Sequence, residues 1–183
     1  PPDLAAAELI LERAVLRGVT ADSRGDGGNG GDLAVTAGTS VQVLSDVLVR
    51  GISTVDKLSG GSGGTVDLEA TFGDVLVAAN LFASGATPDG SGGAITLTAV
   101  GNITTLTGTT LDAHGGGTLS CGGDLCVSAN RAIISNAAID VSGGGGGGNI
   151  DMLAQGAITL NGSILALATT DGGTGGDISI EAG

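Results

Sequence analysis

Three residues, Asp124, Asn149 and Asp177, have side chains and a spacing suited to metal binding. Each directly follows a glycine-rich stretch and directly precedes a stretch of alternating apolar residues, and the spacings between them are 25 and 28 residues. If equivalent residues stack in successive coils of the chain, these side chains lie about 4.8 Å apart. Their oxygens then either share a calcium ion, the one cofactor considered for this chain, or form a ladder of amides and water.

The two cysteines of the chain, Cys121 and Cys126, flank a short stretch that contains two glycines. Cys126 lies between two apolar residues of an alternating stretch, so its side chain is expected to face outward. We predict a local disulfide bridge if the protein is exported, with a stabilisation of about 2 kcal/mol because the loop is short. Two free thiols are the alternative, since a spacing of five residues constrains the geometry of a bridge.

Residue patterns typical of catalysis are not evident. His114, the single histidine, has no second histidine or cysteine at ligand spacing and is predicted to be a surface turn residue. Arg24-Gly25-Asp26 matches an integrin-recognition tripeptide, but such short matches often arise by chance. An enzyme that acts on acidic polysaccharides gathers carboxylates and basic residues on one outer face. The basic residues of this chain are scattered instead, at Arg13, Arg17, Arg24, Arg50, Lys57 and Arg131, so we expect no enzymatic activity.

The charge of the chain limits its partners. Six lysines and arginines stand against 19 aspartates and glutamates, for a formal net charge of -13. A nucleic-acid-binding surface needs basic residues to neutralise phosphates, so nucleic acid is excluded as a partner. No apolar run approaches the ~20 residues of a membrane-spanning helix, and we expect no membrane span.

The elements that must position these residues recur along the chain. A glycine-rich stretch ends and an alternating stretch of the form apolar-x-apolar-x-Ala begins at intervals of 25 to 33 residues. Residues two apart point to the same face of a strand, so the apolar members should point inward and the residues between them outward. The six copies open at Asp32, Thr65, Ala94, Asp124, Asn149 and Asp177.

Two further apolar segments follow each alternating stretch. The second begins at Val41, Val75, Ile103, Ile133 and Ile158, and the third at Val47, Leu81, Leu111, Ile139 and Ile164. Three short strands and one wide glycine-rich turn per unit describe one coil of a solenoid. We therefore predict an all-β fold over residues 19–183, a three-sided, right-handed parallel β-helix of about five full coils plus partial terminal coils.

Residues 1–18 allow two interpretations. Residues 3–17 are rich in helix formers between an N-cap residue and a glycine, as in a helix that caps the first coil. With a period of two, Leu9 and Leu11 instead match the second strand of a partial coil, and Val19 begins the third. We favour the strands.

Two copies of the repeat carry a resemblance to a known family: Gly30-Gly31-Asp32-Leu33-Ala34-Val35-Thr36-Ala37 and Gly175-Gly176-Asp177-Ile178-Ser179-Ile180-Glu181-Ala182. Over roughly residues 19 to 183 the chain resembles secreted bacterial adhesins of the filamentous haemagglutinin type and their glycine-rich relatives. The resemblance implies an extracellular or cell-surface β-helix that acts in adhesion, biofilm or contact-dependent antagonism. No secretion domain or toxin is recognisable, so the resemblance assigns no role to any single residue.

The two ends of the chain have matching phases. Ile178, Ile180 and Ala182 supply the first strand of a coil, whereas Leu9 and Leu11 would supply the second. Because exposed strand edges are templates for pairing, we expect a non-catalytic structural protein whose partner is a further copy of itself, head to tail, in filaments or surface fibres. The alternatives are a stalk or binding segment of a large secreted adhesin, which meets host or cell-surface glycans or proteins, and, least favoured, a polysaccharide-acting β-helix enzyme.

Overall fold

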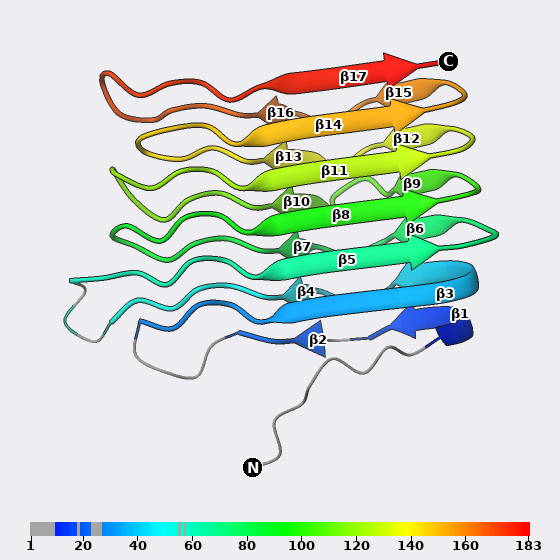
Figure 1. The fold of residues 1–183 in the computed structure, drawn as a ribbon, viewed down its shortest axis with the longest axis horizontal. Helices are drawn as coiled ribbons and strands as arrows, with labels where there is room; N and C mark the ends of the chain where they lie inside the picture. Colours follow the sequence, from blue (N-terminus) through cyan, green and yellow to red (C-terminus); the bar gives the residue numbers. More distant parts are fainter. Residues whose placement is uncertain (1–9, 18, 23–26, 55, 57) are drawn as a thin grey trace, which may run out of the picture.

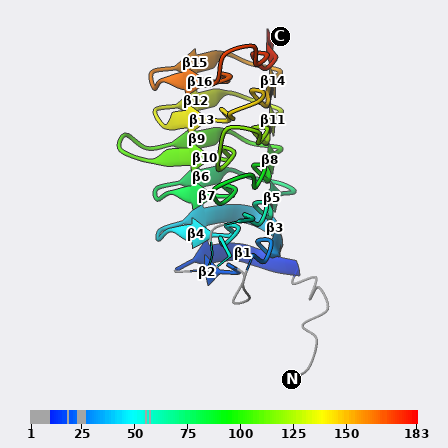
Figure 2. The ribbon, with the colours of Figure 1, turned by 90° about the vertical axis from the view of Figure 1, so that its left-hand side faces the viewer.

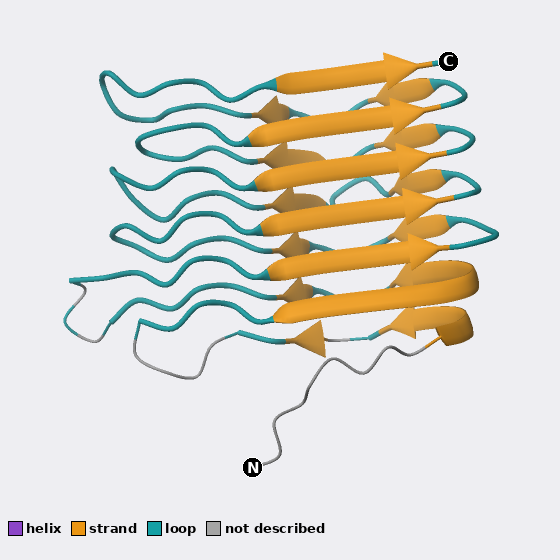
Figure 3. Cartoon of the chain, in the orientation of Figure 1, coloured by secondary structure: helices purple, strands orange, loops and turns teal. Residues whose placement is uncertain are grey.

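The computed structural model describes residues 10–17, 19–22, 27–54, 56 and 58–183, and within these ranges the chain forms strands and no helix. The strands are parallel and stack as a β-solenoid of about six turns (Figure 1), which confirms the predicted fold class. The described part of the chain accordingly has no helix long and apolar enough to cross a membrane (Figure 3).

Each coil contributes one strand to each of three faces. The first face contains the N-terminal half of β3 (Asp32–Val43), β5 (Thr65–Ala70), β8 (Ala94–Ala99), β11 (Asp124–Ala129), β14 (Asn149–Ala154) and β17 (Ile178–Ala182). The second contains β1 (Ile10–Leu16), the C-terminal half of β3, β6 (Val75–Val77), β9 (Ile103–Thr105), β12 (Ile133–Ser135) and β15 (Ile158–Leu160). The third contains β2 (Val19–Thr20), β4 (Val47–Leu48), β7 (Leu81–Phe82), β10 (Thr110–Asp112), β13 (Ala138–Asp140) and β16 (Ile164–Leu165).

The register between coils is the one that the repeat predicts. Asp32 pairs with Thr65, and the same column continues through Ala94, Asp124 and Asn149. The apolar members of the alternating stretches point inward, and Val66, Leu68, Ile95, Leu97, Ile150 and Met152 are at most 2% exposed. A slip of one residue would turn this whole set outward, so the apolar core holds the register.

A pair of glycines closes each coil. The second member of each pair donates its N–H to a carbonyl at the end of the third face, as from Gly93 to Ala83 (2.7 Å) and from Gly123 to Ala113 (2.8 Å). The backbones approach so closely that a Cβ on Gly123 would lie 1.9 Å from the carbonyl oxygen of Gly93 in the coil below. Glycine is therefore required here to avoid a clash. The glycine-rich segments between the third face of one coil and the first face of the next pack backbone against backbone along one side of the solenoid (Figure 1).

The N-terminal segment is a strand where it is described. β1 runs parallel to β3 at the lower end of the stack (Figure 2), so the helical alternative is wrong for residues 10–16. Leu9, one of the predicted assembly residues, lies outside the described residues. Leu11 pairs with Ala37 at the end of the first face, and not on the second face as predicted, because the register shifts between Leu11 and Arg13.

Candidate functional site

The predicted calcium column lies at the start of the first face. The side-chain amide of Asn149 donates to Oδ1 of Asp124 at 3.0 Å, and both side chains are exposed. Asp177 lies immediately before β17, and its backbone carbonyl accepts the N–H of Ile150 at 2.9 Å. Asp124 and Asn149 are thus joined by a direct hydrogen bond from amide to carboxylate. Among the described residues, no three His, Cys, Asp or Glu side chains form a group that could hold a metal ion, and calcium at this column stays a prediction.

Both cysteines are free in the structure, in place of the predicted disulfide. Cys121 forms a parallel bridge with Gly146 of the next coil, and Cys126 pairs in parallel with Asp151 of that same next coil. Each cysteine is therefore held by its own backbone pairing to the coil above. A disulfide needs Cα atoms within ~7 Å in a specific geometry, and the structure forms no such bridge.

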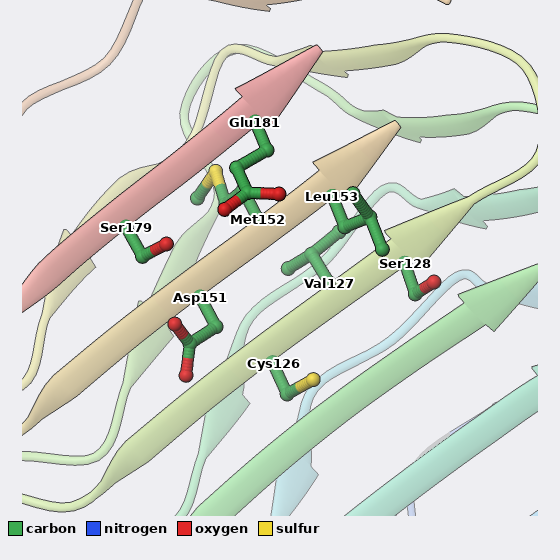
Figure 4. Close-up of a pocket in the computed structure, with 8 residues that line it drawn as sticks. All are labelled: Cys126, Val127, Ser128, Asp151, Met152, Leu153, Ser179 and Glu181. Atoms are coloured by element: carbon green, nitrogen blue, oxygen red, sulfur yellow. The ribbon is translucent and has the colours of Figure 1, made fainter. Parts of the chain in front are cut away.

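A shallow groove of about 300 Å³ crosses the outer surface of the first face over β11, β14 and β17 (Figure 4). One row of its side chains comes from Cys126, Asp151 and Ser179, and the next row includes Leu153 and Glu181. Burial raises the pKa of the Cys126 thiol, and the nearby Asp151 carboxylate raises it further. The thiol is therefore held in its protonated form, which is a poor nucleophile.

A cluster of polar side chains on the third face was not found from the sequence. Nδ1 of His114 lies 2.6 Å from Oδ1 of Asp112, whose side chain is 12% exposed. Asp140 pairs with Asp112 in the next coil, and Ser142 donates a hydrogen bond to the Asp140 carboxylate. The hydrogen bond from His114 to the Asp112 carboxylate raises the pKa of His114; burial partly opposes this effect, and the negative charges of Asp112 and Asp140 add to it.

Sequence signals for this cluster did exist. Asp-x-His at residues 112–114 and Asp-x-Ser at residues 140–142 occupy the same place in consecutive coils. The alternation of side chains puts the members of each pair on one face, and the stacking puts the two pairs side by side. His114 was predicted to be a surface turn residue, but it lies just beyond β10 and is hydrogen-bonded to Asp112.

The other polar residues considered from the sequence are dispersed. Arg50 forms an ion pair with Asp22 at 2.9 Å and lies over the ring of Phe82, 6.0 Å from its centroid. The tripeptide at residues 24–26 lies outside the described residues. These contacts tie neighbouring coils together on the third face.

The two ends of the solenoid leave inward-facing apolar residues uncovered. At the C-terminal end, Ile178 and Ile180 of β17 are 49% and 44% exposed, although they belong to the same inward ladder as Ile150 and Met152. At the N-terminal end, Leu33 and Val35 of β3 are only partly buried. Within the described residues, each end therefore presents partly exposed apolar side chains and a strand edge with no partner along part of its length.

What the structure establishes about identity is the architecture, a parallel β-solenoid. In the comparisons with known proteins, no family model, no curated protein and no solved structure matches the chain.

Proposed function

We propose that this chain is an extracellular, non-catalytic structural solenoid that stacks end to end into filaments or surface fibres. The observation that carries the proposal is the exposure of Ile178 and Ile180, at 49% and 44%, in a ladder whose preceding members, Ile150 and Met152, are 0% and 2% exposed. β17 has the inward pattern of an interior strand, and in the part of the chain that the structure describes no strand lies above it.

Physical chemistry favours covering this end. Burial of apolar surface contributes about 25 cal/mol per Å², and the free edge of β17 presents N–H and C=O groups that a further strand would satisfy. Contact between the C-terminal end of one copy and the N-terminal end of another joins two different surfaces. Such a contact does not close on itself, so it generates an open filament.

The proposal is tested on the purified chain by light scattering and negative-stain electron microscopy. We expect thin fibres from the unaltered chain, and discrete particles from Ile180→Lys, which places a charge in the uncovered ladder. Ser179→Lys is the matched control, because Ser179 faces outward from the same strand, opposite Asp151, and it should still form fibres. Discrete particles from the unaltered chain at every concentration and salt would refute the proposal.

The second candidate is a stalk or binding segment of a large secreted adhesin of the filamentous haemagglutinin type. The same uncovered coil supports it, since further coils of a longer chain would cover Ile178 and Ile180 equally well. On this proposal the outer faces meet host or cell-surface glycans or proteins. Discrete particles of one solenoid length that bind a glycan array would favour it over the filament.

A further inference from the structure

The ends of the described solenoid are stepped in complementary ways (Figures 1 and 2). At the C-terminal end, the first face extends one strand further than the other two faces, because β17 lies beyond β14 while the second and third faces finish with β15 and β16. At the N-terminal end the described second and third faces extend one strand further, to β1 and β2, while β3 is the lowest full strand of the first face.

We infer that the last coil is completed by a second copy of this chain in one defined register, with β17 of one copy, and β1 and β2 of the next, forming a single composite coil. The inference rests on the proposed stacking function and specifies its contact. In this register Ile178 lies beside Leu33 of the next copy, and Ile180 beside Val35. Both partners are partly exposed, whereas Val66 and Leu68, their counterparts one coil up, are 0% exposed.

The other two faces match in the same register. Ile158 and Leu160 of β15 come beneath Ala14 and Leu16 of β1, and Ile164 of β16 comes beneath the first residue of β2. This alignment follows from the pairing between coils of one copy. Ala14 is the first residue of a column of paired inward residues, and Ile158 is the last residue of the same column. Apolar residues therefore meet apolar residues on all three sides.

The part of β3 that no described strand pairs with on this side is shorter than β17. Ile10 pairs with Thr36, and Leu11 with Ala37, so among the described residues only the part of β3 up to Val35 has no partner on this edge. β17 can pair with this part of β3 through Ile178 to Ile180. The edge of β3 beyond that point is already paired with Ile10 of its own copy. Glu181 and Ala182 would compete with Ile10 and Leu11, so one of these two pairs must leave the ladder at the junction.

The junction also brings two carboxylates together. Inside the chain, no two acidic residues are adjacent in the column that starts at Asp32, because Thr65 or Asn149 or another neutral residue separates them. Extending the β17 register by one residue places Asp177 beside Asp32 of the next copy. Like charges directly opposite each other destabilise a strand pair, so stacking should strengthen as salt screens them.

The register is tested by cysteine cross-linking across the junction, in a background with Cys121 and Cys126 replaced by serine. Ala34→Cys with Ser179→Cys places two outward thiols directly opposite each other, about 4.8 Å apart at Cα, within the range of a disulfide. Thr36→Cys with Ser179→Cys is the control, because its offset of two residues separates the Cα atoms by about 8 Å. Oxidation should convert the first variant, and not the second, into a ladder of covalent multimers on non-reducing gels.

The outcomes separate the register from the function. Fibres in which the control pair cross-links, or in which neither pair does, overturn the register but leave stacking intact. Failure of the unaltered chain to assemble at any salt concentration removes the stacking function itself. Asp177→Asn gives a second measurement: it should form fibres at lower salt than the unaltered chain, whereas Asp171→Asn, which removes an equal charge outside the column, should not. Equal shifts for the two variants would also count against the register.

Discussion

At the scale of single residues, His114 links the stability of the solenoid to pH. Its hydrogen bond to Asp112 raises the pKa of the imidazole above the ordinary value of 6.5, against the partial opposition of burial, and the charges of Asp112 and Asp140 add to the rise. A group whose pKa is raised by folding stabilises the folded state while it is protonated. This stabilisation is fully present below pH 6.5 and is lost as the pH rises through the folded-state pKa.

We therefore expect the free energy of unfolding to be higher at about pH 6 than at about pH 8.5, measured by urea denaturation at fixed ionic strength. His114→Gln should lose this difference, because it removes the titrating group. A pH dependence that His114→Gln leaves unchanged would show that another group is responsible.

Val127 tests the inward ladder. It is 3% exposed and lies between Leu97 and Met152, so Val127→Asp buries a charge without a partner and should cost on the order of 3–5 kcal/mol. Ser128→Asp, on the adjacent outward position, should change the free energy of unfolding by less than about 0.5 kcal/mol. Thermal melting compares the two variants, and equal losses would mean that the register is wrong by one residue.

At the scale of the elements, the glycine pairs decide how closely consecutive coils can approach. A Cβ on Gly148 would lie 1.8 Å from the carbonyl oxygen of Gly123, whereas a Cβ on Gly146, in the same turn, would meet no atom closer than 3.6 Å. Gly148→Ala must therefore push two backbones apart, at a cost of at least about 1–3 kcal/mol. Gly146→Ala should be close to neutral.

Chemical denaturation of both glycine variants measures this difference. The comparison is matched because the two positions share one turn and one substitution. If Gly146→Ala destabilised the protein as much as Gly148→Ala, flexibility of the turn, and not close contact between the backbones, would explain the glycines.

In the coil that contains β3, the strand boundaries differ from those predicted from the repeat. The alternating stretch at Asp32 and the segment at Val41 were predicted as separate strands, but they form the single strand β3. In the coils above, a turn separates the equivalent segments, as between β5 and β6. Val41 still pairs with Val75, although the chain reaches Val41 along a continuous strand and reaches Val75 after a turn. The inward ladder requires only that both side chains point into the core.

At the scale of the whole molecule, each coil contacts mainly the coils above and below it, so loss of a terminal strand should leave the remaining stack folded. Deletion of residues 177–183 removes β17 and should abolish fibre formation while circular dichroism still reports a β-rich monomer. Deletion of residues 181–183 is the matched control. It removes only positions that compete with Ile10 and Leu11, and it should leave fibres intact.

Electron microscopy of the two deletions reads out this prediction. Fibres of unchanged axial repeat from the longer deletion would mean that β17 is not part of the junction. Loss of fibres from the shorter deletion would place the essential contact at Glu181 and Ala182, and would exclude the composite coil described above.

The alternating pattern was sufficient to predict the inward and outward positions and the stacking of Asp32 on Thr65, because a period of two between glycine-rich turns admits only one phase that buries the apolar residues. Only the tertiary structure showed that β1 shifts register after Leu11 and that Cys121 and Cys126 form no bridge. These features depend on the three-dimensional path of the backbone through the corners and along the strands. Local alternation carries no information about that path, since it specifies which way a side chain points and not what lies opposite it.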